Sequence, residues 1–530
     1  MKQLPENCSM YEAIRQNISG SAVTVAISFY GRKYTFSRVH RWIDTLADNL
    51  AAEFSIGKGD TVTLCMPNSP AALICFYAAN KLGAAVNLVH PFIPPEKLKE
   101  SVEKTSSKLV LIYDLYKCGR YDFGVPTLLS DSSHYMGAAA KAYYRLTKKR
   151  TAFGYVSFEK YLKNRKNPSA QTAAFGENEA AVYLASGGTT GEPKIIAHNN
   201  RVFNTLCAKA EEFLSEPIQM YRALYNVLPI FHGFGLCINM HMCMLMRRTN
   251  IMCIQFSPKM SAKQIVKGKA NILTGVPTMF LKLLGEKAFV NADLSNIKDV
   301  YVGGDSVPQQ LIDDFNAALE RGGSRARMYV GYGLTETVTV CLVNTLAHHR
   351  ENSIGYPLSN TAVKIMKDGA ELPAGAVGEI YLDTDQFMIG YLNEEYSPFE
   401  TIGGRRWLKT GDYGWVDADG YLYFKQRIKN MIKVSGVPVY PSEIEAAACE
   451  VSGVRKACAV GISDTVKGQV VRLFVECREG TDRAACEREI LETCRRKLIS
   501  YAVPKEIVFE EKLPVNLIGK IDRKVLENRK

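Results

Sequence analysis

The chain has 530 residues, of which 47% are hydrophobic and 23% are charged, and its formal net charge is +12. This length excludes a single ordinary hydrophobic core, so we expect a globular protein of two or more domains. The positive charge is compatible with acidic small molecules, an anionic membrane or nucleic acid as partners. It does not select among them, because most excess charge on enzymes lies on the solvated surface.

Strand-like and helix-like segments alternate in chain order over the first 330 residues. A strand and turn are predicted at 60–69 and a helix at 70–84, with Pro70 near its start and Gly83 near its end. Apolar runs typical of buried strands follow at 107–114, 181–186, 222–230, 249–256, 270–276, 298–304 and 325–333. A helix is expected between Pro308 and Gly322. The alternation predicts an α/β fold with layered sheets, helices and parallel strands.

The pattern changes near residue 425. Short strands at 456–462, 471–477 and 506–510 surround a helix at 483–498, which together indicate a compact α+β unit of about 100 residues. We place the domain boundary in the basic segment around Lys429. The predicted organisation is a large N-terminal domain, 1–427, and a small C-terminal domain, 428–530.

The segment 136–166 is basic and rich in tyrosine, and includes "KAYYRLTKKR". It could form an amphipathic surface helix that approaches acidic lipid. The simpler interpretation, which the sequence favours, is a solvated helix or loop in an insertion.

Cysteine usage and the apolar runs bear on the compartment. Fourteen cysteines are scattered without a CxxC pair or a zinc-like cluster, and Cys237, Cys243 and Cys253 lie in apolar surroundings typical of buried thiols. The N-terminal residues contain no signal-peptide core, and the apolar runs are too short to span a bilayer. We expect no transmembrane segment, no nucleic-acid partner and a cytoplasmic location.

A glycine-rich stretch, "LASGGTTGEPKIIAH", occupies residues 184–198. It differs from a Walker A loop, because Lys194 follows Pro193 instead of a glycine and is followed by Ile195. A strand leading into a glycine- and threonine-rich turn still offers backbone N–H groups and hydroxyls to phosphate. Alone, such a turn is more often structural than ligand-binding.

An ordered set of further motifs accompanies this loop. They are "PIFHGFGL" from Pro229, "GVPTMF" from Gly275, "VGGDSVP" from Val302, "GYGLTE" from Gly331, "KTGDYGWVDADGYLYF", "QRIKNMIKVSGVPVYPSEIE" and "LPVNLIGKIDRKVL". In this order, over nearly the whole chain, they resemble the adenylate-forming superfamily of acyl-CoA synthetases, luciferases and peptide-synthetase adenylation domains. The resemblance implies that a carboxylate attacks the α-phosphate of MgATP, giving an acyl-adenylate that passes its acyl group to a thiol.

The resemblance also implies the nucleotide site. The loop would wrap the β- and γ-phosphates, Glu336 would bind Mg²⁺, and Thr335 would donate to the α-phosphate. Tyr332 and Gly333 would lie against adenine, with Gly303, Gly304 and Asp305 as the opposite wall. Asp412 would accept from the ribose hydroxyls, and Arg427 would reach the ribose or phosphate. The loop residues concerned are Ser186, Gly187, Gly188, Thr189, Thr190, Gly191 and Lys194.

Catalysis and domain movement are assigned in the same way. Lys520, in "IGKIDR", would bridge the substrate carboxylate and the α-phosphate. Lys429 would be the hinge, and Ser435 and Gly436 would meet the pantetheine arm of CoA. Each residue, taken singly, has an ordinary structural explanation, such as a surface charge, a turn aspartate or a core tyrosine.

His232 bears on the acid. Relatives that activate amino acids usually carry an aspartate here to pair with the ammonium group, whereas a buried, unpaired ammonium would be costly. We therefore expect a fatty or aryl acid. The resemblance to acyl-CoA synthetases implies that His232 helps to close the pocket, and the Met-rich run after Gly235 could line this pocket or form core. The acceptor is expected to be CoA; a phosphopantetheine carrier protein and a non-catalytic nucleotide-binding homologue are the alternatives.

Overall fold

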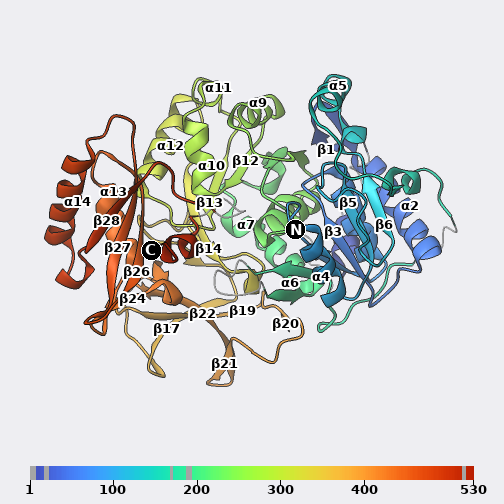
Figure 1. Cartoon of the computed structure of the whole chain (residues 1–530). Helices are drawn as coiled ribbons and strands as arrows, with labels where there is room; N and C mark the ends of the chain where they lie inside the picture. Colours follow the sequence, from blue (N-terminus) through green and yellow to red (C-terminus); the bar gives the residue numbers. More distant parts are fainter. Residues whose placement is uncertain (1–7, 17–22, 167–170, 187–193, 516–520, 530) are drawn as a thin grey trace. The chain divides into compact units, whose positions relative to one another are not determined.

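The computed structural model describes residues 8–16, 23–166, 171–186, 194–515 and 521–529, which divide into two compact units (Figure 1). Unit 1 comprises Met1–Thr361 and Thr384–Ser397, and unit 2 comprises Ala362–Asp383 and Pro398–Lys530. The expected α/β class is confirmed. The boundary expected at 427 and 428 falls inside unit 2, between its two sheets, and stays a prediction about the hinge.

One sheet of unit 1 carries the glycine-rich loop at its edge. In the described residues its strand order is β20-β9-β8-β4-β3-β5-β6-β7, with β8 to β7 parallel and with β9 and β20 antiparallel to their neighbours. The strands are β3 (Thr61–Cys65), β4 (Ala85–Leu88), β5 (Ser107–Tyr113), β6 (Thr127–Ser130), β7 (Val156–Ser157), β8 (Val182–Ala185), β9 (Ile195–His198) and β20 (Gly390–Tyr391).

The second sheet of unit 1 has the order β16-β15-β14-β13-β12-β10-β11-β1-β2 in the described residues. Its central strands, from β14 to β1, are parallel, so their carboxyl ends share one edge. The strands are β1 (Val25–Phe29), β2 (Arg32–Thr35), β10 (Ala223–Asn226), β11 (Thr249–Met252), β12 (Ile272–Gly275), β13 (Asp299–Gly303), β14 (Met328–Gly333), β15 (Val340–Val343) and β16 (Tyr356–Pro357).

Several helices of unit 1 begin at side-chain caps that the sequence supplies. Thr35 accepts from the Arg38 N–H at the start of α2, and Ser69 accepts from the Ala72 N–H at the start of α3, where Pro70 is the first helical residue. The longer helices are α1 (Met10–Gln16), α2 (Phe36–Phe54), α3 (Pro70–Lys81), α4 (Pro95–Lys104), α5 (Ala138–Thr147), α6 (Asn200–Ala208), α9 (Pro258–Gly268), α10 (Pro277–Leu284) and α12 (Gln309–Arg321). Short helical segments are η1 (Ser132–Tyr135), η2 (Phe158–Leu162), α7 (Ala210–Phe213), η3 (Ile218–Met220), η4 (Phe234–Met242), α8 (Cys243–Leu245), α11 (Lys287–Val290) and η5 (Thr335–Thr337).

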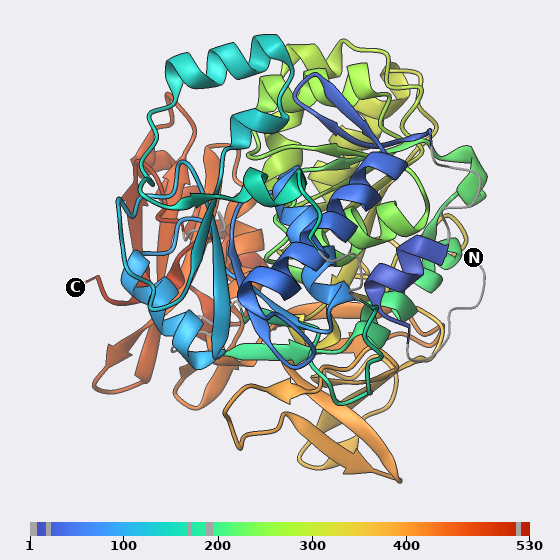
Figure 2. The same cartoon turned by 90° about the vertical axis from the view of Figure 1, so that its right-hand side faces the viewer.

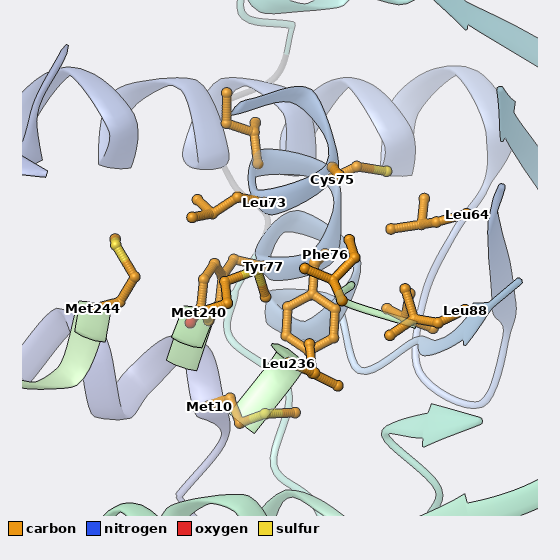
Figure 3. Close-up of a cluster of buried hydrophobic side chains, with 14 of the residues drawn as sticks. Met10, Leu64, Leu73, Cys75, Phe76, Tyr77, Leu88, Leu236, Met240 and Met244 are labelled. Carbon is orange, nitrogen blue, oxygen red and sulfur yellow. The ribbon is translucent and has the colours of Figure 1, made fainter. Parts of the chain in front are cut away.

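Helix α3 lies at the centre of the core of unit 1, and all of its residues are buried. Figure 3 shows it between β3 and β4, which contribute Leu64 and Leu88, and the segment that contributes Leu236, Met240 and Met244. A helix covered on all sides must be apolar all round, which explains the run "PAALICFYAAN". Across the described residues, no helix combines the length and the apolar character that crossing a bilayer needs.

The Met-rich run forms η4, a π-helix, and it contains a buried histidine with two partners. The Nε2 atom of His241 lies 2.9 Å from Oδ1 of Asn204, and its Nδ1 atom lies 3.1 Å from the Tyr77 hydroxyl. Since Asn204 uses its NH₂ group to donate to the Cys8 carbonyl, its oxygen accepts from Nε2. His241 is therefore the neutral Nε2–H tautomer, and burial lowers its pKa to about 3.

Unit 2 contains an antiparallel sheet that the sequence analysis did not predict. In the described residues its order is β18-β17-β19-β22-β21, with β23 beside β22. Two hairpin turns in it, Asp368-Gly369 and Gly403-Gly404, have positive φ at both residues, as type I′ turns require. The strands are β17 (Thr361–Lys367), β18 (Ala370–Glu371), β19 (Gly378–Thr384), β21 (Phe399–Ile402), β22 (Arg405–Val416) and β23 (Leu422–Arg427).

The second sheet of unit 2 confirms the predicted α+β region. It has the order β25-β24-β27-β26 with β28 beside β27, and α13 and α14 pack against each other next to it. The elements are η6 (Ile428–Asn430), β24 (Ile432–Val434), β25 (Val437–Val439), α13 (Pro441–Cys449), β26 (Val454–Asp464), β27 (Gly468–Cys477), α14 (Arg483–Lys497), η7 (Ser500–Ala502), β28 (Glu506–Glu510) and α15 (Arg523–Glu527).

The buried His241 predicts a pH dependence of stability. Between pH 6.5 and about pH 3 the unfolded chain takes up a proton at His241 and the folded chain does not, so stability is lost as the pH falls. The loss amounts to about 1.4 kcal/mol per pH unit. In the His241→Gln variant, thermal unfolding should depend less on pH between pH 7 and pH 5 than in the wild type. An equal pH dependence in the two proteins would show that His241 titrates normally in the folded state.

Candidate active site

The glycine-rich loop joins two antiparallel strands, β8 and β9, whose register pairs Ala185 with Ile195. Ser186 closes its base: its backbone N–H donates to the Lys194 carbonyl at 2.8 Å, and its hydroxyl accepts from the Lys194 N–H at 3.0 Å. The predicted residues Gly187, Gly188, Thr189, Thr190 and Gly191 lie outside the described residues, as does Lys520.

The ammonium group of Lys194 is held by one carboxylate and two aromatic rings. Its Nζ atom lies 2.6 Å from Oε2 of Glu394, 4.4 Å from the ring centroid of Tyr391 and 4.3 Å from that of Tyr396. The two rings are nearly parallel, with an interplanar angle of 16°. Such contacts stabilise a cation that is partly removed from water.

Tyr391 also contacts Glu336, the predicted magnesium ligand. Its hydroxyl donates to Oε1 of Glu336 at 2.9 Å, and burial, followed by the charge of Glu336, raises the pKa of Tyr391 well above its usual range. The phenol therefore stays protonated and donates. Because β20 pairs with β9, with Tyr391 opposite Ile196, one tyrosine connects the loop lysine to the "GLTE" carboxylate.

The backbone around Glu336 is tightly constrained. A Cβ atom on Gly333 would lie 1.5 Å from the Thr339 carbonyl oxygen, and one on Gly233 would lie 1.6 Å from that of Val338. Val338 itself has φ +67°, a costly conformation for a β-branched residue. The close approach of Gly233 to Val338 brings the "FHG" motif against the segment that follows Glu336.

The predicted adenine-binding residues lie on two adjacent parallel strands. Gly303 ends β13 and pairs with Gly331 of β14, one residue before Tyr332. A Cβ atom on Gly303 would lie 2.7 Å from the Gly331 carbonyl oxygen, so glycine is required here. Gly304, with φ +82°, and Asp305 follow at the exposed carboxyl edge, beside the half-buried Tyr332.

His232 lies in the turn between β10 and η4. Its ring centroid is 4.9 Å from that of Phe231, which in turn is 4.6 Å from that of His90. The Leu236 N–H donates to the His232 carbonyl at 2.9 Å, so the residue is fixed at the start of η4. Cys237 and Cys243 farther along this segment are fully buried, as predicted, and so is Cys253 on the segment after β11.

Two predicted ribose or phosphate contacts face each other within unit 2. Asp412 of β22 is directly opposite Arg427 of β23, and Nε of Arg427 lies 3.2 Å from Oδ1 of the buried Asp412. The Arg427 side chain remains 46% exposed, so it keeps N–H groups turned to solvent. The two residues can therefore offer a ligand one acceptor, Asp412, and one cation, Arg427, from a single pair of neighbouring strands.

The predicted hinge and CoA residues lie between and within the sheets of unit 2. Lys429 is exposed in η6, the short turn between the two sheets. Ser435 and Gly436 form the two-residue turn between β24 and β25, with φ +51° and +79°. Both values are those of a type I′ turn, in which glycine is favoured at the second position.

Sequence reasoning did not identify Tyr391, Glu394 and Tyr396 as site residues. They occur in "GYLNEEY", residues 390–396, of which the first two form β20. The cluster of two tyrosines and two acids in seven residues was the available signal. Its meaning depends on the pairing of β20 with β9, about 195 residues earlier in the chain.

The donor set suits a magnesium ion shared with phosphate. No group of three or more His, Cys, Asp or Glu side chains in the part of the chain that the structure describes could hold a metal ion by itself. A single half-buried carboxylate, Glu336, fits Mg²⁺, which commonly takes one or two carboxylates and completes its shell with water and phosphate oxygens.

Known proteins are similar to this chain in sequence and in fold. The chain is 29% identical over 525 residues to a long-chain-fatty-acid–CoA ligase of Bacillus subtilis, covering 94% of this chain and 91% of that one. It is 27% identical to a 4-coumarate:CoA ligase of Petunia hybrida, covering 94% and 89%. A crystal structure of an anthranilate–CoA ligase with anthranoyl-AMP shares the fold, with a TM-score of 0.83 at 22% identity over 99% of this chain and 97% of that one.

Family models match both parts of the chain. The model of the AMP-binding enzymes matches residues 14–392, and that of the AMP-binding enzyme C-terminal domain matches residues 443–520. The chain therefore belongs to the family of AMP-binding enzymes.

Proposed function

We propose that the protein is an ATP-dependent acyl-CoA synthetase, which converts a carboxylic acid, ATP and CoA into acyl-CoA, AMP and pyrophosphate through an acyl-adenylate. The observation that carries the proposal is the contact chain from Lys194 through Tyr391 to Glu336. This contact chain holds a cation, Lys194, and a carboxylate suited to Mg²⁺, Glu336, against the same tyrosine side chain, beside the loop expected to bind triphosphate. The named CoA ligases that match over most of their length support the same reaction.

The first step requires that one anion attack another. Lys194 and the loop N–H groups would neutralise the β- and γ-phosphates, and Mg²⁺ on Glu336 would offset further negative charge. In the described structure Lys194 is paired with Glu394. We infer that the triphosphate takes the place of Glu394, while the rings of Tyr391 and Tyr396 keep the ammonium group in position.

In the second step the thiol of CoA, and no longer Lys520, must lie at the reacting acyl carbon. Lys520 would act in the first step by bridging carboxylate and α-phosphate. The turn at Ser435 and Gly436 would approach the thiol arm in the second step. We expect the chain to turn about Lys429, because η6 is a short, exposed connection in which a few residues can absorb a torsional change.

The acid is expected to be fatty or aryl. His232 offers no carboxylate to an α-ammonium group, and the segment that follows it, η4, is formed mainly by apolar and sulfur-containing side chains, with Asn239 and His241 as its polar members. CoA is the expected acceptor, with a carrier protein as the alternative. A reducing, cytoplasmic location remains our expectation, and all fourteen cysteines are free thiols.

A panel of acids tests the reaction directly. We expect pyrophosphate release to depend on a fatty or aryl acid, and an acyl-CoA thioester to form when CoA is the only thiol present. A thioester that forms only on a carrier protein would replace CoA as the acceptor. If no acid in a broad panel promotes exchange of pyrophosphate into ATP, the protein is a non-catalytic nucleotide binder.

Two substitutions in unit 2 should separate the half-reactions. Lys520→Ala should abolish adenylation and spare thioester formation from supplied acyl-adenylate. Gly436→Val should do the reverse, because a β-branched residue resists the φ of +79° that the turn requires at this position. Each half-reaction is measured alone, with circular dichroism as the folding control. Equal loss of both half-reactions in a folded Lys520→Ala protein would contradict the assigned role.

Removing the Tyr391 hydroxyl should weaken adenylation. Tyr391→Phe keeps the ring beside Lys194 and deletes the hydrogen bond to Glu336. Hydrogen bonds to charged groups contribute about 1.5–3 kcal/mol, so we expect kcat/KM for MgATP to fall about ten- to a hundred-fold. The Mg²⁺ concentration for half-maximal pyrophosphate release should rise. Tyr396→Phe is the matched control, and an equal effect of both substitutions would argue against a specific role of the Glu336 contact.

A further inference from the structure

Helix α5 is attached to unit 1 by one side only. Tyr144 is buried and its hydroxyl donates to the carboxylate of Asp114, with distances of 3.1 and 3.2 Å to the two oxygens. Ala140, one turn earlier, packs against the core. These contacts determine which face of the helix turns inward, and Figures 1 and 2 show α5 at the rim of unit 1.

The opposite side of α5 is an apolar stripe that faces solvent. Ala139, Ala142, Tyr143 and Leu146 follow the i, i+3, i+4, i+7 spacing of one helical face, and all four are exposed. Tyr143 is 66% exposed and Leu146 is 87% exposed. Surface helices of globular proteins normally bury such a stripe. Here the stripe points away from the core, which leaves it available to an external apolar phase.

Basic side chains border this stripe. Segment 136–166 contains nine lysines and arginines and a single acidic residue, Glu159, which is buried. Lys141 and Arg145 lie on the flank of α5, and Lys148 and Lys149 are exposed directly after its last turn. Part of the charge is offset, because Arg145 and Arg150 both pair with Asp131. The exposed lysines keep the surface positive.

The loop that follows α5 also combines exposed apolar side chains with lysines. Phe153 is 61% exposed and Val156 is 48% exposed, and Lys160 and Lys163 are exposed a few residues later. We call residues 138–163 the α5 surface. Its exposed apolar side chains alternate with lysines, and its one carboxylate is turned inward. A nucleic acid would use the lysines but would leave the apolar stripe in water, whereas a bilayer with anionic headgroups accommodates both.

We propose that the α5 surface docks on a membrane containing anionic phospholipid. Tyr143, Leu146 and Phe153 enter the boundary between headgroups and acyl chains, and the lysines lie at the level of the lipid phosphates. Each basic residue near such a surface adds to binding, and salt weakens the attraction. The proposal is independent of the reaction proposed above, because it uses residues of another part of unit 1.

Vesicle co-sedimentation of the full chain tests the proposal. The protein should pellet with vesicles of phosphatidylglycerol and phosphatidylcholine mixed, and should remain largely unbound with phosphatidylcholine alone. Lys148→Glu combined with Lys149→Glu should lower partitioning about tenfold or more. Tyr143→Ser combined with Leu146→Ser should lower it comparably, and this loss should persist at high salt.

Matched controls come from exposed positions in unit 2. Val466 is 89% exposed, and Lys367 and Lys512 are exposed lysines. Val466→Ser, and Lys367→Glu combined with Lys512→Glu, should leave partitioning unchanged. Three results would each overturn the proposal. The first is equal binding to neutral and anionic vesicles, and the second is an equal loss of binding in the control variants. The third is binding to RNA that competes with vesicles and needs no apolar residue. Loss of folding is excluded by circular dichroism of every variant.

Discussion

One side chain, Tyr391, supports the two charged groups on which the proposed chemistry depends. Its hydroxyl donates to Glu336, and its ring lies 4.4 Å from the ammonium group of Lys194. Attack of a carboxylate on a triphosphate succeeds only where positive charge and fixed donors offset the repulsion between anions. The pairing of β20 with β9 places Tyr391 at the end of the loop, so the edge of a sheet determines both contacts.

Much of the fold could be predicted from local pattern. Helices such as α3 and α12 have clear start and stop signals, and the strands of the parallel sheets are short apolar runs between turns. The antiparallel sheet of unit 2 was missed because its strands are partly exposed and weakly patterned. Its Asp368-Gly369 and Gly403-Gly404 turns were nevertheless readable as hairpin signals. For the candidate site, ordered motifs pointed to Glu336 and Tyr332, whose roles stay predictions, but the partners of Lys194 come from a strand pairing that no local pattern encodes.

The positive charge of the chain is used in distinct ways. Lys194 is a single cation held between aromatic rings and a carboxylate, where its position matters more than the net charge. The lysines around α5 instead form a broad field next to an exposed apolar stripe. Composition alone could not separate these roles, because every lysine adds the same single unit to the net charge of +12 wherever it lies. The structure distinguishes Lys194 from the lysines around α5 by the burial of each side chain and by the groups next to it.

The most direct test of the account is a crystal structure of the protein with MgATP, or with a non-hydrolysable analogue. The account predicts that Lys194 leaves Glu394 and lies within hydrogen-bonding distance of the β- or γ-phosphate, with Glu336 at the metal and still bonded to Tyr391. A triphosphate bound while Lys194 remains on Glu394 and Glu336 stays remote from the metal would contradict it.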